Sequence, residues 1–437
     1  MSDDSQSSGS SSGSDSGSDD GSSFNPGFGD GSESVSDSFT ETSHTSWFER
    51  MKQAIVGVVA GLVMVAGSIG LLFWNEGRAV TTSRSLSEGA AAVVSAQPAR
   101  VDPAHEGKLV HVAGDLKLAG PVADPEFGVS ATVIKLVRKV EMYQWKEESR
   151  QEKRTNVGGS QETVTTYTYV REWSEKRNDS SRFKQPGGHG NPEMRYQSRA
   201  NVAPSASLGA FQLTAETLGQ VSGGERLPVD QARLQQLRQR LGNNVHLRDG
   251  TIYVGVDPDS PRIGDLRISF EQVTAEQLTV IARQAGSGFG RYQTKAGDQL
   301  LIVAKGVVPA AQLFSQAQAA NSTLTWILRG VGAVLMFVGF GLFFRPLGVL
   351  GDVLPILGDV IRMGTGVIAF VLTLLLATTT IAIAWVYHRP LVGIAVLVVG
   401  VGGTIGMIML AKKRRAARMA GAPVPARAAA RPVGPVS

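Results

Sequence analysis

The chain contains 437 residues, with 43 Lys and Arg against 38 Asp and Glu, and it has no cysteine. A protein without cysteine has no disulfide, no thiolate zinc site, no iron–sulfur cluster and no cysteine nucleophile. The net charge of +5 averages an acidic N-terminal segment and a basic C-terminal segment, so it indicates no partner by itself.

Residues 1–46 are predicted to form a disordered acidic tail. They consist largely of Ser, Gly and Asp and carry nine acidic residues but no Lys or Arg. So few apolar side chains cannot offset the entropy lost when a chain becomes ordered. A phosphorylated or partner-binding tail is the alternative interpretation.

Four apolar segments are each long enough to cross a membrane. A helix rises 1.5 Å per residue, so about 20 apolar residues span a hydrocarbon core of about 30 Å. A signal peptide fits the first segment poorly, because its apolar core is shorter and lies closer to the start of the chain. The predicted spans are residues 54–74, 325–344, 363–387 and 391–411.

Basic residues beside these segments predict the orientation. Residues 412–437 form a basic tail without an acidic residue, and such tails remain cytoplasmic and attract anionic lipid. With four spans the N-terminus is cytoplasmic too, which places residues 75–324 in the periplasm or lumen. Residues 345–362 contain Asp352 and Pro355, so we expect an interfacial cytoplasmic loop; a re-entrant element or partner site is the alternative.

Residues 75–324 are predicted to form an α+β domain in which antiparallel strands dominate. Segments such as ETVTTYTYVREW and GTIYVGV are rich in Val, Thr and Tyr, as strands are. One helix is expected where Leu234, Leu237 and Leu241 share a face before Gly242. The polar stretch 147–162 is either a long hairpin tip or a mobile loop. The fold class is therefore a multi-pass α-helical membrane protein, one span before and three after this extracytoplasmic domain.

The sequence contains little that indicates catalysis. No two of the six histidines lie within one helical turn of each other, so a local zinc motif is missing. His189, among Gly and Pro, is the best single histidine candidate, although a structural role in a turn is favoured. The GSGFG segment at 286–290 lacks the Lys-Ser/Thr of a phosphate loop. We expect no enzyme activity, no cofactor, no metal and no nucleic-acid partner.

Glycines in the apolar segments are candidate helix-packing positions. Gly57 and Gly61 form one GxxxG pattern, and Gly402 and Gly406 form another. This spacing allows two helix backbones to approach closely. The alternative is that glycine is simply common in membrane helices.

Seven motifs, in this order, resemble the LUMA family, also called transmembrane protein 43. They are LLFWNEGRAV at 71–80, VEMYQWKE at 140–147, YTYVREWS at 167–174, GHGNPE at 188–193, GDLRISFE at 264–271, TWILRGVG at 325–332 and PLGVLGDVLPILGDV at 346–360. We name the following positions the signature residues: Trp74, Asn75, Glu76, Gly77, Arg78, Tyr143, Trp145, Trp173, His189, Asn191, Pro192, Trp326 and Arg329. Trp74 suits the interfacial belt, and Asn75 and Gly77 suit a helix stop.

The resemblance implies a membrane-organising scaffold that self-associates and contacts other membrane proteins. Eukaryotic members of the family lie in the endoplasmic reticulum and inner nuclear membrane, whereas the Ala, Gly, Val and Arg bias of this chain favours a bacterial cytoplasmic membrane. The two tails are not part of the family pattern. A ligand-binding sensor or membrane-bound enzyme that uses the extracytoplasmic domain is the alternative function.

Overall fold

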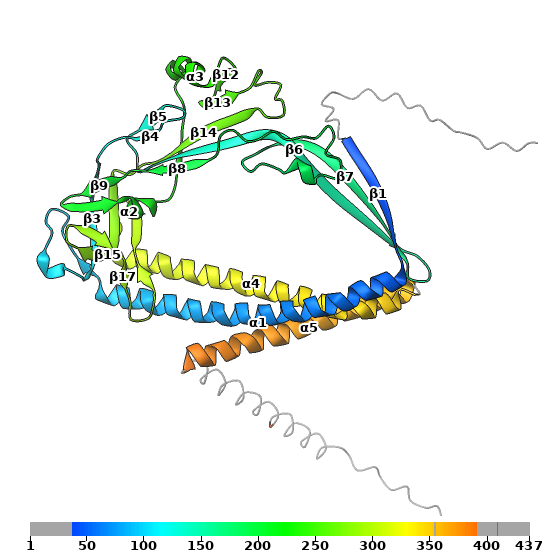
Figure 1. Ribbon diagram of the computed structural model, residues 1–437. Coiled ribbons are helices and arrows are strands. Elements are labelled where there is room, and N and C mark those ends of the chain that lie inside the picture. The colour runs from blue at the N-terminus through cyan, green and yellow to red at the C-terminus, as the bar shows by residue number, and fades with distance from the viewer. Residues whose placement is uncertain (1–36, 354, 391–408, 410–437) are drawn as a thin grey trace, which may run out of the picture.

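The computed structural model describes residues 37–353, 355–390 and 409. The first 36 residues of the predicted tail, the fourth predicted span except Met409, and the basic tail lie outside the described residues. Gly402 and Gly406 therefore lie outside them as well. The described chain forms a layer of three long helices and a β-rich domain that arches over them (Figure 1).

Three helices of the described chain are long and apolar enough to cross a membrane. They are α1 (Trp47–Ala92), α4 (Ala310–Gly351) and α5 (Pro355–His388), and we call them the helical layer. The first three predicted spans lie inside these helices. The 46 residues of α1 correspond to a length of about 69 Å, which is far more than a single span requires.

Two predicted helix boundaries are wrong. The helix stop expected at Asn75 and Gly77 does not exist, because α1 continues to Ala92. Asn75, Glu76 and Arg78 form hydrogen bonds with neighbouring helices, which allows α1 to continue through this polar segment. The predicted interfacial loop 345–362 is also largely helical, since α4 runs through Pro346 to Gly351 and α5 begins at Pro355.

Small residues bring α1 and α4 close together. A Cβ atom on Gly61 would lie 2.5 Å from the carbonyl oxygen of Gly339 and 2.9 Å from the backbone nitrogen of Phe343. A Cβ atom on Gly57 would lie 3.8 Å from the carbonyl oxygen of Leu342. The GxxxG pattern of α1 therefore serves a helix contact within the chain.

Two sheets make up most of the domain, and nearly all their strand pairs are antiparallel. The first contains β1 (Asp37–Thr45), β7 (Gln161–Ser174), β6 (Lys135–Thr155), β14 (Leu266–Val273), β13 (Thr251–Val254) and β12 (Val245–Arg248), with β8 (Arg199–Val202) and β11 (Glu225–Leu227) at its side. The second contains β19 (Ile302–Lys305), β15 (Gln277–Ala285), β16 (Gly288–Gly290), β10 (Phe211–Thr214), β9 (Ser205–Leu208), β3 (Leu109–Leu118) and β2 (Val94–Ser95).

Smaller elements complete the domain, and the β-rich prediction for it is confirmed. Two short ribbons are β4 (Val122–Asp124) with β5 (Val129–Ala131) and β17 (Tyr292–Gln293) with β18 (Gln299–Leu300), and α2 covers Ala215–Gly219. The helix predicted around Leu237 is α3 (Leu234–Leu241), and Gly242 follows it at φ +99°. The core contains buried apolar side chains from both sheets, among them Val110, Leu136, Phe211 and Phe270.

The polar stretch 147–162 belongs to a long β6–β7 hairpin. Its turn, residues 156–160, is here called the hairpin tip, and it meets the N-terminal end of α1 (Figure 1). Arg50 Nη1 donates to the Gly159 carbonyl at 2.5 Å, and the Gly158 amide donates to the Val353 carbonyl at 3.2 Å. Gly159 has φ +80°, and a Cβ there would lie 2.4 Å from the Trp47 indole.

Part of the predicted disordered tail is a strand. Residues 37–45 form β1, which pairs with β7 from Asp37↔Tyr169 to Thr45↔Gln161. Low apolar content favoured disorder, but the open edge of β7 provides backbone hydrogen bonds to the Thr-rich segment. Phe39 also stacks on Tyr167, with ring centroids 6.3 Å apart.

The β1–β7 pairing joins part of the predicted tail to the domain. We expected residues 1–46 and 75–324 on opposite faces of the membrane, but residues 37–45 and 161–169 belong to one sheet. The domain also contacts the other end of α1, where Ser85 Oγ lies 2.8 Å from Thr294 Oγ1 and the Lys295 amide donates to Glu88 at 3.0 Å. The domain is therefore attached to α1 near both of its ends.

The shared sheet predicts that β1 and the domain lie on one face of the membrane, because an open polar sheet does not cross a hydrocarbon core. Cysteine labelling tests this prediction, since the natural chain has no cysteine. Ser38→Cys in β1 and Gln235→Cys in α3 both replace exposed residues. We expect a membrane-impermeant maleimide to label both variants in intact cells, or neither, with full labelling of both after permeabilisation. Labelling of only one of the two in intact cells would contradict the shared sheet.

The α1–α4 contact predicts different effects of alanine at two glycines of α1. Gly61→Ala should lower stability by about 1–3 kcal/mol, because the added methyl group meets backbone atoms of α4. Gly67→Ala is the matched control, since a Cβ there has no neighbour within 4 Å. Thermal unfolding in detergent micelles measures both, and an equal loss in the two variants would be evidence against the contact.

Candidate functional site

The signature residues gather in two places. Those of α1 and α4 form a polar network inside the helical layer, and those of the domain lie on the β6–β7 hairpin and the loop that follows it. Trp74 belongs to neither group, because its side chain is exposed on α1.

Glu76 is the centre of the helical network. Its carboxylate is buried and accepts two hydrogen bonds from Arg329, at 2.6 Å from Nε and 2.8 Å from Nη2. The indole Nε1 of Trp385 in α5 donates to the same carboxylate at 2.8 Å. The Arg329 guanidinium also lies 4.6 Å from the ring centroid of Trp326. A two-point arginine–carboxylate pair of this kind is strong and directional, so Glu76 connects all three helices.

Asn75 and Arg78 extend this network along the α1–α4 contact. Asn75 Nδ2 donates to the Thr325 carbonyl at 3.1 Å. Arg78 donates from Nη1 to Asn321 Oδ1 at 3.0 Å and from Nη2 to Thr325 Oγ1 at 3.1 Å. Both residues therefore hold α4 in register with α1.

Gly77 lies beside His388 at the end of α5. A Cβ on Gly77 would lie 2.8 Å from His388 Cε1 and 2.9 Å from Nε2. In the NEGR segment, Glu76 and Arg78 thus contact α4, whereas Gly77 allows the end of α5 to lie close to the α1 backbone. A cavity of about 240 Å³ beside this network is lined by Glu76, Trp326, Arg329 and Trp385, among others.

The second group fixes the GHGNPE loop to the hairpin. Asn191 Oδ1 accepts from the Trp145 amide at 2.7 Å, and its Nδ2 donates to the Trp145 carbonyl at 2.9 Å. His189 Nδ1 donates to the Gln185 carbonyl at 3.0 Å, and the imidazole stacks on Tyr169 at 3.9 Å between centroids. His189 is buried, so its observed contacts are those of a packed structural residue.

Aromatic contacts complete this group. The rings of Tyr143 and Trp173 lie 5.2 Å apart, and Pro192 packs where a side chain on Gly264 would clash. Burial, together with the Glu147 carboxylate, raises the pKa of Tyr169 to about 12. Its hydroxyl therefore stays protonated and donates to Glu147 at 2.8 Å.

Several important residues were not singled out from the sequence. Trp385 is a lone aromatic residue near the end of a predicted span, and its position was the only available signal. Asp352 was noted only as a residue that breaks the connector, yet it is buried and paired with Arg50 and Arg362. Within residues 37–353 and 355–390, no group of three or more His, Asp or Glu side chains could hold a metal ion.

Comparisons with known proteins show a clear family likeness. The model of a family described as transmembrane protein 43 matches residues 142–390. The rat protein named transmembrane protein 43 is 34% identical over 364 residues, covering 80% of this chain and 89% of the rat protein. The human protein of that name is 33% identical over 362 residues, covering 80% and 89%. A Drosophila melanogaster homologue is 31% identical over 376 residues, covering 83% and 95%. No solved structure matches the chain significantly.

The Glu76 network predicts a specific loss of stability. Glu76→Gln removes the charge that Arg329 requires, and breaking a buried ion pair costs about 3–5 kcal/mol. Thermal unfolding in detergent micelles, followed by the fluorescence of the adjacent tryptophans, measures the loss. Glu49→Gln replaces an exposed acid of the same helix and should change stability by less than about 0.5 kcal/mol. Similar unfolding temperatures for the two variants would contradict a structural role for the network.

Proposed function

Because this chain belongs to the transmembrane protein 43 family, we propose that it is a non-enzymatic membrane scaffold that self-associates and organises membrane protein complexes or membrane structure. One observation carries the proposal. The polar signature residues are used to hold helices and sheet together within the chain, while apolar side chains remain exposed along the helices.

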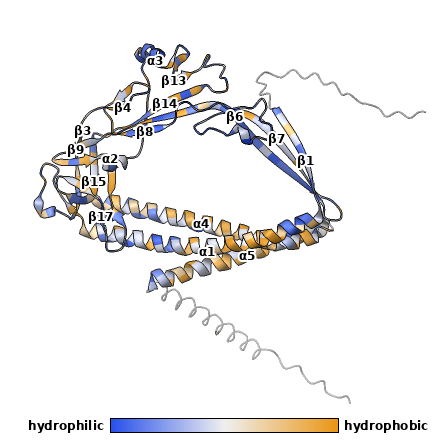
Figure 2. Ribbon diagram, in the orientation of Figure 1, coloured by the Kyte–Doolittle hydropathy of each residue, from blue (hydrophilic) through white to orange (hydrophobic). Residues whose placement is uncertain are grey.

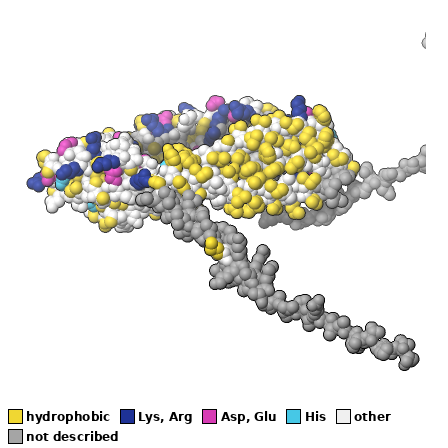
Figure 3. All heavy atoms as spheres, turned by 90° about the horizontal axis from the view of Figure 1, so that it is seen from below, with side chains coloured by type: hydrophobic (Ala, Val, Ile, Leu, Met, Phe, Trp, Pro, Cys, Tyr) yellow, Lys and Arg dark blue, Asp and Glu magenta, His cyan; other side chains and the backbone are white. Residues whose placement is uncertain are grey.

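The exposed apolar surface of the helical layer supports a partner in the membrane. Val59 of α1, Val334 of α4 and Leu374 of α5 are each more than half exposed among the described residues. The apolar middle of the layer stands out in Figure 2, and Figure 3 shows apolar side chains gathered over one part of the face seen from below. Apolar area of this extent requires lipid or protein against it.

The buried polar groups already have partners within the chain, which favours a scaffold over an enzyme. Glu76 is paired with Arg329, and His189 is packed between aromatic rings. A general acid, base or nucleophile has to reach a substrate, whereas these groups are turned toward partners within the chain.

A cavity beside Trp173 is the best site for the alternative, a ligand sensor. It has a volume of about 350 Å³ and is lined by Arg226, Arg248 and Arg267. Each guanidinium already has a partner: Arg226 donates to Thr251, Arg248 pairs with Asp259 and Arg267 pairs with Glu141. The scaffold therefore remains the better-supported function.

Self-association has to use a face other than the GxxxG face of α1. Gly61 already packs against α4 of the same chain, so a second copy would meet other exposed apolar side chains. We place the protein in a bacterial cytoplasmic membrane, or in the endoplasmic reticulum or inner nuclear membrane if it is eukaryotic. Its proposed partners are the bilayer, a second copy of the chain and other membrane proteins.

Crosslinking in native membranes tests self-association. Single cysteines at Val59, Val334 and Leu374 report on exposed positions of the three helices, and Ala377→Cys is a buried control on α5. At native expression, a bifunctional maleimide should give a dimer band from at least one exposed position and none from the control. Recovery of monomer alone at every position would argue strongly against the scaffold.

A further inference from the structure

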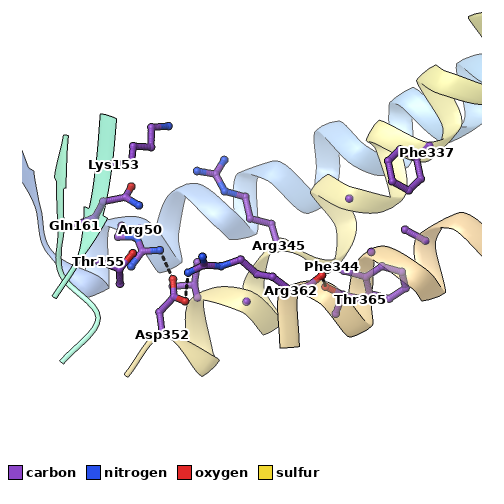
Figure 4. Close-up of a pocket in the computed structure, with 15 residues that line it drawn as sticks. Arg50, Lys153, Thr155, Gln161, Phe337, Phe344, Arg345, Asp352, Arg362 and Thr365 are labelled. Carbon is purple, nitrogen blue, oxygen red and sulfur yellow. Dashed lines mark hydrogen bonds and ion pairs between the residues drawn. The ribbon is translucent and has the colours of Figure 1, made fainter. Parts of the chain in front are cut away.

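A cationic pocket lies where the hairpin meets the helical layer, away from the signature residues. Its volume is about 460 Å³. The described residues that line it include Arg50 of α1, Lys153 of β6, Arg345 of α4, Arg362 of α5 and the acid Asp352 (Figure 4). Among the described lining residues, four side chains are therefore positive and one is negative. We call it the arginine pocket.

Two of these cations are held by the acid. The Asp352 carboxylate is buried between the guanidinium groups of Arg50 and Arg362, with one oxygen paired to each. These two ion pairs fix one wall of the pocket.

The other two cations have no ion pair or hydrogen bond with any residue in the described part of the chain. Lys153 extends from the strand and Arg345 from α4, and their charged ends point into the space between hairpin and helices (Figure 4). Both residues are exposed. An anion in the pocket could therefore form ion pairs with both side chains without displacing a carboxylate from either.

The arginines lie at one level of the helical layer, beside the apolar segments. Arg50 precedes residue 54 by four positions, Arg345 directly follows residue 344, and Arg362 directly precedes residue 363. In a membrane protein this level is that of the lipid headgroups, where basic pockets between helices bind anionic lipids. Phosphate suits them because guanidinium groups bind its oxygens in pairs.

The rest of the lining is apolar, which a site for free phosphate would not require. Phe337, Phe344 and Ala369 contribute to it, and Phe337 is exposed on α4. These side chains continue toward the apolar middle of the layer (Figures 2 and 4). We propose that the arginine pocket binds the phosphate headgroup of an anionic phospholipid, with Lys153 and Arg345 on the phosphate and an acyl chain along Phe337.

Lipid titration of the full-length chain in neutral detergent tests the proposal. Phosphatidylglycerol is the probe, and the shift in unfolding temperature gives an apparent Kd. The double variant Lys153→Gln/Arg345→Gln should bind about thirtyfold more weakly, given the usual contribution of two cations near anionic lipid. Both residues are exposed, and the unfolding temperature without added lipid checks that the variant folds.

The matched control is Arg154→Gln/Lys52→Gln. Arg154 is the next residue of β6 and points to the opposite face of the strand, and Lys52 lies on α1 outside the pocket lining. We expect the control to bind within about twofold of the natural chain. An equal loss of affinity in the control variant would mean that phosphatidylglycerol is attracted by positive charge anywhere on the surface. That result would overturn the proposed binding site.

Two further titrations identify the source of the phosphate. Phosphatidylcholine and inorganic phosphate, each at the same concentrations, should shift the unfolding temperature far less than phosphatidylglycerol does. An equal shift with inorganic phosphate would overturn the lipid assignment, and so would an equal shift with phosphatidylcholine. Because the readout is binding by a single chain, failure here is distinct from failure of self-association.

Discussion

The fold depends on one constraint: the β-rich domain is attached to both ends of the same long helix. At the N-terminal end of α1, Arg50 bonds to the hairpin tip and pairs with Asp352. Toward its C-terminal end, Ser85 and Glu88 bond to residues 294–295 of the domain. Both contacts join residues that are far apart in sequence. Together they set the distance between the two points at which the domain is attached to the helical layer.

Buried charge gives this arrangement its specificity. Apolar helices pack with little preference for register in a lipid environment, because lipid tails are as apolar as their side chains. The Glu76–Arg329 pair joins α1 to α4, and the Arg50–Asp352 pair joins α1 to the residue that caps the end of α4. A shift of one helix by a single residue would leave a buried charge without its partner, which is costly. The pairs therefore define one alignment among many that apolar contact alone would permit.

Features that depend on the local sequence pattern could be predicted from the sequence, whereas contacts between residues far apart in the chain could not. The apolar lengths predicted three helices that the structure contains, and the Leu234–Leu241 spacing predicted α3, because both depend on local periodicity. The extension of α1 beyond Gly77 was missed, since Asn75 and Arg78 form hydrogen bonds with α4 residues more than 240 positions away. Strand β1 was missed for the same reason, because its partner edge on β7 is invisible to local composition. The family motifs marked Glu76, Arg329 and Asn191 without revealing which residues each one contacts.

The order of β1 in the chain has a consequence for biosynthesis. Residue 45 pairs with residue 161, so the strand leaves the ribosome well before the edge that receives it. At a synthesis rate of about 5–20 residues per second, the delay is on the order of 10 s. During that interval α1 leaves the ribosome without either α4 or the hairpin tip beside it. The first folded unit therefore cannot be α1 together with β1. Strand β1 remains unpaired until the β6–β7 hairpin has been synthesised and can complete the sheet.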